Sequence, residues 1–351
     1  MSTQSQPAPV PAPETTRSSG AAALEVTGLT VDYRRRGAAP LRALDGLSFR
    51  LEPGKTLALV GESGSGKSTV VRTLAGFTAP SAGTVDLAGV AGLRGRRARV
   101  AYRSALQLVF QDPFASLNPM HTVERHLRRP IARYRRPDGR EATRAAVHEL
   151  LSLVNLTPPA DFAAKYPHEL SGGQRQRVAI ARALATDPQV LLADEPVSML
   201  DVSIRLEILN LLDFLTRDRG LALLYVTHDL ATARHFSQEI IVLYRGQVVE
   251  SGPSDEVILN PAHPYTRMLA DAAPNPATTR AQAAAARRER LARRSAHAAE
   301  QREADTGTGC IFASRCPHAK PVCATAPGDI PAGPGHTARC WMLTEQYPHE
   351  S

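Results

Sequence analysis

The sequence feature that most constrains the fold is a glycine- and serine-rich loop between an apolar run and a helix-like run. Leu57–Val60 is strand-like, residues 61–69 read GESGSGKST, and apolar residues then recur at helical spacing from Val70. Glycines let successive backbone N–H groups turn inward, and the start of the following helix adds partial positive charge. The loop therefore predicts a site for a phosphorylated ligand at the end of a strand.

The residues of this loop have distinct expected roles in nucleotide binding. Lys67 is expected to bridge the β- and γ-phosphates of ATP, and Ser68 to place its hydroxyl on Mg²⁺. An ordinary glycine-rich turn is the alternative, and the strand before the loop and the helix after it argue against it. The loop residues predicted to bind nucleotide are Gly61, Ser63, Gly64, Ser65, Gly66, Lys67, Ser68 and Thr69.

A second motif supplies the acids that ATP hydrolysis needs. Residues 190–196 read VLLADEP, an apolar run that ends in two carboxylates. Beside a phosphate loop, Asp194 would lie near Mg²⁺, and Glu195 would act on the attacking water as its general base. Surface acids at a strand end are the alternative for this motif when it stands alone.

A third motif predicts a second anion site. Residues 170–174 read LSGGQ, in which Ser171 is a good helix N-cap and two glycines expose backbone N–H groups. The alternative is an ordinary capped helix with a glycine hinge.

The order of apolar runs predicts the architecture. Short strands separated by turns are expected from Leu24, and strand-like runs at Val190–Ala193, Leu221–Val226 and Ile240–Leu243 alternate with helical patterns. This alternation predicts an α/β fold with a mostly parallel sheet covered on both faces. The predicted domains are a disordered tail (1–23), an ATP-binding domain (24–270) with a helical subdomain at about 112–185, an Ala/Arg-rich linker helix (271–306) and a small cysteine-rich C-terminal module (307–351).

Composition and charge narrow the class of protein. The chain carries 42 Lys and Arg against 34 Asp and Glu, and residues 280–303 hold half of the net charge of +8, with seven arginines and three glutamates. A solvated helix or linker explains this segment, and binding to anionic lipid or nucleic acid is the alternative. No apolar run approaches the ~18–20 residues of a membrane span. The N-terminal residues show no charged region followed by an apolar stretch, so secretion is not expected. An intracellular protein is therefore expected.

With these motifs, the chain resembles the ATP-binding subunits of ABC transporters, whose signature pentapeptide matches residues 170–174 letter for letter. The resemblance covers roughly residues 24–270 and implies a phosphate-loop ATPase with a RecA-like core, an inserted helical subdomain, and ATP and Mg²⁺ as cofactors. It implies that two such subunits pack head to tail, so that each ATP contacts one phosphate loop and, in trans, the other subunit's signature residues: Ser171, Gly172, Gly173 and Gln174.

The resemblance also assigns roles to four single residues. It implies that Tyr33 stacks on adenine, that Gln111 touches Mg²⁺ and faces the membrane partner, that Asp201 belongs to a loop crossing to the other subunit, and that His228 contacts the γ-phosphate. The implied Mg²⁺ ligands are Ser68, Gln111 and Asp194. Met199 departs from the small residue usual in the family at that position. Since the remaining motif residues are present, hydrolytic competence is expected.

Other segments resemble the oligopeptide and dipeptide importer branch of this family. These are FQDPFASLNP at 110–119, NPAHPYT at 260–266 and the cysteine-rich C-terminus. The resemblance implies two membrane permeases, a second ATP-binding subunit (a paralogue or the same chain), an extracytoplasmic substrate-binding protein and a place on the cytoplasmic face of the membrane. Residues 112–119 are expected to line a groove that receives a permease helix. Nickel or glutathione-like cargo is the first alternative, and a nucleic-acid-associated ABC ATPase the second.

The cysteines predict a bound cofactor. Cys310, Cys316, Cys323 and Cys340 all lie in the last 42 residues and lack the tight pair usual in structural zinc sites. Wider spacing suits a 4Fe–4S cluster, whose four corners need separate thiolates, and the family resemblance implies the same group. Such a cluster would have a structural role, because so small a segment needs a cross-link in order to fold. Zn²⁺ and unligated thiols are the alternatives.

Overall fold

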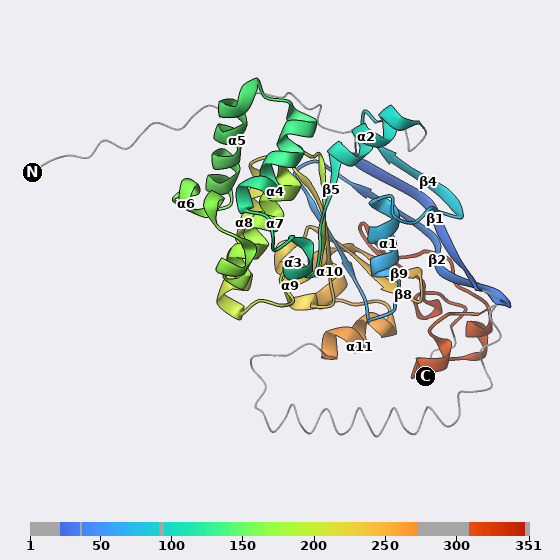
Figure 1. The fold of residues 1–351 in the computed structure, drawn as a ribbon. Helices are drawn as coiled ribbons and strands as arrows, with labels where there is room; N and C mark the ends of the chain where they lie inside the picture. Colours follow the sequence, from blue (N-terminus) through green and yellow to red (C-terminus); the bar gives the residue numbers. More distant parts are fainter. Residues whose placement is uncertain (1–21, 36, 91–94, 273–308, 348–351) are drawn as a thin grey trace, which may run out of the picture.

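In a computed structural model, the protein folds into two β-sheets flanked by helices (Figure 1). The phosphate loop lies between the two sheets. The structure describes residues 22–35, 37–90, 95–272 and 309–347. The predicted disordered tail falls outside these residues apart from positions 22 and 23. The predicted linker helix 271–306, with its arginine-rich stretch 280–303, falls outside them after residue 272.

The larger sheet has eight strands in the order β10-β11-β9-β8-β3-β7-β6-β5. Its five parallel strands are β5 (Leu106–Val109), β6 (Val190–Asp194), β7 (Ala222–Thr227), β3 (Thr56–Val60) and β8 (Glu239–Tyr244). Three antiparallel strands continue it: β9 (Gln247–Pro253), β11 (His336–Ala338) and β10 (Ile330–Gly333). The parallel centre confirms the α/β prediction.

The parallel strands are apolar through their centres because both of their faces are buried there. In β3, Ala58 and Val60 join one hydrophobic core, whereas Leu57 and Leu59 join the other. Side chains alternate between the two faces of a strand, so each strand needs apolar residues at successive positions. One core lies under the helices, and the other lies between the two sheets.

The smaller sheet is antiparallel and consists of β1 (Leu24–Arg35), β2 (Ala38–Leu51) and β4 (Ala82–Leu87). The expectation of short strands from Leu24 was wrong, because β1 has 12 residues and β2 has 14. The pairing of β1 with β2 shifts register near Leu29 and again near Tyr33. Such bulges break the alternation of apolar and polar residues, which is why long strands look short in the sequence.

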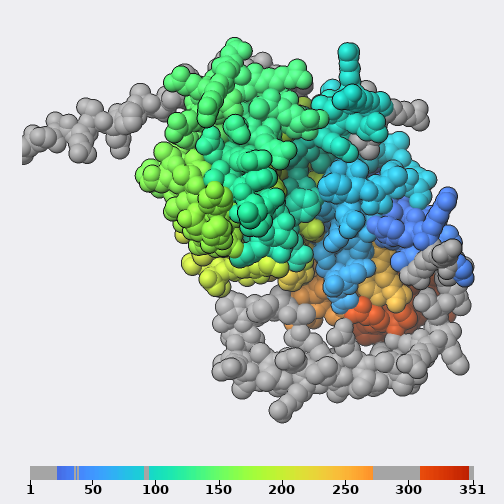
Figure 2. Space-filling model, viewed as in Figure 1, coloured from blue at the N-terminus to red at the C-terminus, as the bar shows by residue number. Residues whose placement is uncertain are grey.

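Helices cover the larger sheet. Those between β5 and β6 form one lobe, green in Figure 2, beside the N-terminal strands in blue. They are α3 (Pro113–Ser116), α4 (Val123–Pro130), η1 (Ile131–Arg135), α5 (Gly139–Leu153), α6 (Pro159–Ala164), η2 (Pro167–Glu169) and α7 (Gly172–Leu184). The remaining α-helices are α1 (Lys67–Leu74), α2 (Arg96–Ala105), α8 (Val202–Arg217), α9 (Leu230–Phe236), α10 (Ser254–Leu259) and α11 (Pro264–Ala272). None of the helices in the described ranges is both long and apolar enough to cross a membrane.

Residues 309–347, here called the cysteine segment, are joined to the rest of the fold through the sheet. They contain the short helical turns η4 (Ala313–Arg315), η5 (Pro321–Ala324) and η6 (Trp341–Leu343). Strand β11 pairs with β9, Thr337 opposite Ser251, and Phe312 is buried in the core beneath the helices. The segment thus extends the larger sheet, a connection that no pattern in the sequence indicated.

Candidate functional site

The predicted catalytic residues follow strands that lie side by side. Gly61 follows β3, His228 follows β7, Glu195 follows β6, and Gln111 comes two residues after β5, while β3, β7, β6 and β5 are consecutive in the sheet. The carboxyl ends of parallel strands meet at one edge, where open α/β sheets bind their ligands. The topology therefore brings together side chains that are up to 167 positions apart in the chain.

The phosphate loop wraps around the Lys67 side chain. The lysine Nζ donates to the carbonyl oxygens of Gly61 at 2.6 Å and Glu62 at 3.0 Å, and the residue is buried. A Cβ on Gly61 would lie 2.3 Å from the Leu243 carbonyl oxygen, so only glycine fits there. Burial lowers the pKa of Lys67, and the nearby Glu195 and Asp194 oppose that shift. The ammonium and both carboxylates therefore share one electrostatic environment.

Glu195 is held between two side chains from neighbouring strand ends. Gln111 Nε2 donates to its Oε2 at 3.0 Å, and His228 Nδ1 lies 3.0 Å from its Oε1. The Glu195 backbone has a φ of 44° and donates its N–H to the Val226 carbonyl on β7 at 2.9 Å. This uncommon backbone turn aims the carboxylate out of the strand and toward its two partners. We call Gln111, Glu195 and His228 the Glu195 network.

Asp194 lies one position earlier, as the last residue of β6. Burial raises the pKa of its carboxyl, the charge of Glu195 raises it further, and Lys67 opposes both effects. Ser68, an exposed residue in the first turn of α1, offers a hydroxyl. Mg²⁺ in nucleotide sites usually takes one or two carboxylates together with phosphate oxygens and water, so this donor set suits it.

The signature residues form the capped start of α7. Ser171 Oγ accepts from the Gln174 N–H at 3.3 Å, and Gln174 Oε1 accepts from the Ser171 N–H at 3.0 Å. A Cβ on Gly173 would come within 2.5 Å of Ile204 Cγ2, so this glycine lets α7 pack against α8. Across the described ranges, no hydrogen bond joins these residues to Lys67 or to the Glu195 network.

Two further predicted residues lie outside the Glu195 network. Tyr33 is an exposed side chain on β1, opposite Leu41 of β2. Asp201 is the N-cap of α8, where its carbonyl accepts from the Arg205 N–H at 2.8 Å and its side chain makes no capping bond. Met199 in the same loop is also exposed.

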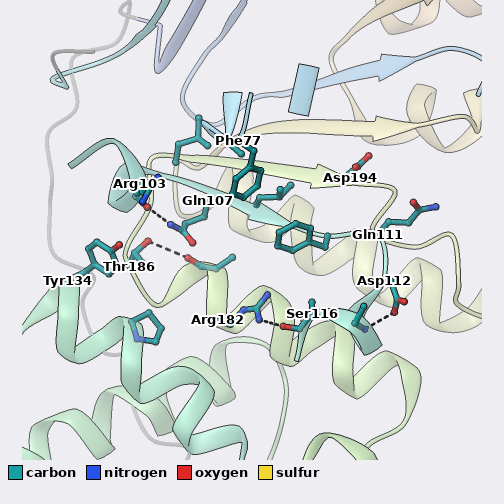
Figure 3. A pocket seen from close by; sticks show the side chains of 17 residues that line it. Phe77, Arg103, Gln107, Gln111, Asp112, Ser116, Tyr134, Arg182, Thr186 and Asp194 are labelled. Atoms are coloured by element: carbon teal, nitrogen blue, oxygen red, sulfur yellow. Dashed lines mark hydrogen bonds between the residues drawn. The ribbon is translucent and has the colours of Figure 1, made fainter. Parts of the chain in front are cut away.

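A groove runs from the catalytic edge along the helical lobe. It has a volume of about 880 Å³, with Asp194 and Gln111 at one end and Tyr134 at the other (Figure 3). Phe77 stacks on Phe110 in its wall, with ring centroids 6.5 Å apart. Its lining includes polar and apolar residues in or next to α2, β5, α3 and α7, namely Arg103, Gln107, Asp112, Ala115, Ser116, Arg182 and Thr186.

The expectation that residues 112–119 line a groove holds for part of that segment. Asp112, Ala115 and Ser116 line it, and Arg182 of α7 donates to the Ser116 carbonyl. Phe114 is exposed beside the groove, where the Arg175 guanidinium lies 4.2 Å from the centre of its ring. Leu117 is buried in the core and anchors the segment.

The four cysteines line one small cavity of about 10 Å³ between the start of α11 and the cysteine segment. None of the four forms a disulfide. Burial raises the pKa of Cys316 to about 12 and that of Cys340 to about 11. His263, Phe312 and Trp341 complete the lining. Within the described residues, no three His, Cys, Asp or Glu side chains are arranged to hold a single metal ion.

Sequence reasoning missed two contacts that tie the cysteine segment to the ATP-binding fold. Arg315 forms an ion pair with Glu62 of the phosphate loop, with Nη1 2.8 Å from Oε2. His336 Nε2 lies 2.7 Å from Oε1 of Glu250, a fully buried carboxylate on β9. Both pairs join residues far apart in the chain, and with one sequence no local pattern could have found them.

Comparisons with known proteins agree with this geometry. The ABC transporter family matches residues 44–198, and the family described as "Oligopeptide/dipeptide transporter, C-terminal region" matches residues 249–323. The chain is 40% identical to the oligopeptide transport ATP-binding protein AppF of Bacillus subtilis over 88% of this chain and 92% of that one. It is 40% identical to OppF of Escherichia coli over 86% and 87%.

Solved structures show the same fold. The dimeric ATP-binding cassette MJ0796, in a post-hydrolysis state bound to ADP and Pi, matches with a TM-score of 0.59 and 32% identity. The match covers 66% of this chain and 98% of that one. The cbiO1 protein of Clostridium perfringens, part of the cbiONQ ABC transporter complex, matches with a TM-score of 0.59 and 26% identity, covering 68% and 91%.

Proposed function

The chain belongs to the ABC transporter family of ATP-binding proteins, and from this premise we propose that it powers the import of dipeptides or oligopeptides across a cell membrane by hydrolysing ATP. The observation that carries the proposal is the position of the Glu195 network at the sheet edge that bears the phosphate loop. The transport names of the relatives and the match of residues 249–323 to the oligopeptide/dipeptide transporter family support peptide as the cargo.

The residues of the site divide the work of hydrolysis. The backbone N–H groups of residues 63–69 and the Lys67 ammonium bind the phosphates, and Ser68, Asp194 and Gln111 would hold Mg²⁺. Bound Mg²⁺ neutralises charge on the β- and γ-phosphate oxygens. Glu195 accepts a proton from the attacking water, while Gln111 and His228 hold its two oxygens in place. We propose that His228, whose side chain is 63% exposed, also contacts the γ-phosphate.

The second anion site supports a paired arrangement. The capped start of α7 presents backbone N–H groups and partial positive charge, yet makes no hydrogen bond to Lys67 within the described residues. We infer that Ser171–Gln174 bind the γ-phosphate of an ATP held by a second ATP-binding subunit, and that Asp201 and Tyr33 act in that assembly. The two matching structures of the cassette MJ0796 are dimeric.

The groove is proposed to receive a short helix from a membrane permease. Its lining joins exposed aromatic rings with Gln111 and Asp194, so an occupant would be in direct contact with the ATP site. Two permeases and an extracytoplasmic substrate-binding protein would complete the importer, with this chain bound at the cytoplasmic face. The alternatives are an importer of nickel or glutathione-like cargo and an ATPase that binds nucleic acid. Membrane association and cargo-stimulated ATP turnover distinguish them from a peptide importer.

We propose that the four cysteines hold a 4Fe–4S cluster with a structural role. Four thiols around one cavity are the donor chemistry that this group needs, and its four irons bind thiolates at separate corners. The cluster would cross-link the cysteine segment. Anaerobically purified protein should be brown with about four irons per chain, and Cys316→Ser should lose the colour. Colourless protein with one zinc per chain would contradict the proposal.

Association with membranes tests the proposed function. When the chain is expressed with its neighbouring subunits, we expect it to copurify in detergent with integral membrane proteins at high salt. Salt-sensitive binding to DNA, with no membrane protein retained, would instead support the nucleic-acid alternative.

A further inference from the structure

A residue of the cysteine segment, Arg315, forms an ion pair with the phosphate loop. Arg315, directly before Cys316, donates from Nη1 to Oε2 of Glu62 at 2.8 Å and from Nη2 to Oε1 at 3.0 Å. Paired N–H···O bonds between a guanidinium and a carboxylate fix orientation as well as position. Glu62 is the second residue of the phosphate loop, so the C-terminal part of the chain grips the loop directly.

Glu62 connects Arg315 to Lys67, the residue expected to bind phosphate. Its carbonyl oxygen accepts from Lys67 Nζ at 3.0 Å and from the Ser65 N–H at 3.2 Å. Its own N–H donates to the Tyr265 hydroxyl at 2.8 Å. A shift of Glu62 would therefore move both the acceptor of the Lys67 ammonium and the start of the loop.

An aromatic cluster fixes the position of Arg315. The rings of Tyr244 and Tyr265 lie 4.6 Å apart, and Phe312 contacts both with centroids at 5.3 and 5.5 Å. The Arg315 guanidinium carbon lies 5.6 Å from the Tyr244 ring and 5.8 Å from that of Phe312. Phe312 and Tyr265 are fully buried, so the platform under the guanidinium is rigid.

The negative charge of Glu62 lies in the loop that is expected to bind the phosphates of ATP. A carboxylate in a loop that binds a polyphosphate repels the ligand, and the guanidinium beside it offsets that repulsion. The Glu62 and Arg315 side chains are 34% and 28% exposed, so water screens the pair only in part. Removing the Arg315 guanidinium would take away its share of the positive charge that offsets this repulsion.

We propose that Arg315 is a positioning residue for nucleotide binding: it orients and neutralises Glu62, and so gives the cysteine segment control over the affinity of the phosphate loop for ATP. The inference rests on the proposed function, because it takes ATP as the ligand of that loop. Arg315 touches no residue of the Glu195 network in the described structure, so it acts on binding and leaves the chemical step unchanged.

A double-mutant cycle on the full-length chain tests the proposal, with MgATP affinity and steady-state ATP hydrolysis as readouts. Arg315→Ala should raise the Kd and KM for MgATP about five- to tenfold and leave kcat within about twofold. Arg315→Lys should recover part of the affinity, because it keeps the charge and loses the paired geometry. In a Glu62→Gln background, Arg315→Ala should have little further effect, because the charge to be neutralised is gone.

Arg339→Ala is the matched control, because Arg339 also lies in the cysteine segment and pairs with Asp329, away from the loop. It should leave the Kd for MgATP unchanged. Hydrogen exchange of the loop amides should be faster in Arg315→Ala than in wild type or Arg339→Ala.

Three results would overturn the proposal: an unchanged Kd in Arg315→Ala, an equal loss of affinity in the Glu62→Gln background, or a fall in kcat with Kd preserved. A wild-type chain that binds no MgATP would instead refute the proposed function, so the two failures are distinguishable.

Discussion

At the residue scale, the account depends on Glu195. The sequence places an acid at this position after an apolar run, but its partners come from two other strand ends. Gln111 and His228 were assigned only through family resemblance, and their contact with Glu195 depends on strand order, which a single sequence does not encode locally. The contact between Arg315 and Glu62 could not be predicted for the same reason.

Replacing Glu195 by Gln tests its role as the general base. The variant keeps the side-chain shape and loses the group that accepts the proton, so we expect ATP turnover to fall by about 10²–10⁴-fold while MgATP still binds. Turnover and equilibrium binding are measured on the same preparation. Glu149→Gln, on the exposed face of α5, is the control and should match wild type. Turnover in Glu195→Gln within a few-fold of wild type would refute the assignment.

At the scale of elements, periodicity and loop chemistry predicted the parallel strands well. Most of their core-facing positions are apolar, and β3 and β6 end at the glycine-rich loop and the paired acids that are visible in the sequence. The long strands β1 and β2 were missed because bulges interrupt their alternation. The pairing of β11 with β9 was also missed, because a strand of three residues is too short to show an alternating pattern in the sequence.

The buried carboxylate of Glu250 on β9 binds both β11 and the loop that precedes α11. It accepts from the N–H groups of Ala262 and His263 at 2.8 and 2.9 Å, and it lies 2.7 Å from Nε2 of His336 on β11. Glu250→Ala would leave buried donors without an acceptor, so we expect the free energy of unfolding to fall by about 3 kcal/mol or more.

Urea denaturation monitored by circular dichroism measures this loss. Glu250→Gln should lose less stability because it keeps an acceptor oxygen, and Glu256→Ala, on the exposed side of α10, should lose little. A Glu250→Ala protein as stable as wild type within 0.5 kcal/mol would show that this contact does not hold the cysteine segment in place.

At the scale of the whole molecule, the site is incomplete within one chain. The signature residues and Asp201 make no hydrogen bond to the Glu195 network in the described structure, and the groove leaves Phe77 and Phe110 exposed. The sequence indicated a partnered protein through its motifs, whereas the shape of the groove depends on how the helical lobe packs against β5.

A charge placed in the groove should separate ATP hydrolysis from assembly. Phe77 is 60% exposed and contributes to no hydrophobic core, so Phe77→Asp should fold normally. We expect wild-type basal ATP turnover of the isolated chain and at least tenfold weaker association with the permeases, measured by pull-down in detergent. Leu259→Asp, exposed on α10, is the control and should bind as wild type does. Normal permease binding by Phe77→Asp would place the docking site elsewhere.

The central claim is that this chain converts ATP hydrolysis into peptide import, and the most direct measurement uses the complete importer in sealed vesicles. ATP turnover is followed while the substrate-binding protein delivers peptides, nickel or glutathione in separate experiments. The account predicts that peptide raises turnover and accumulates inside the vesicles, and that Glu195→Gln abolishes both effects. Turnover that no delivered peptide changes, or that only nickel or glutathione raises, would contradict it.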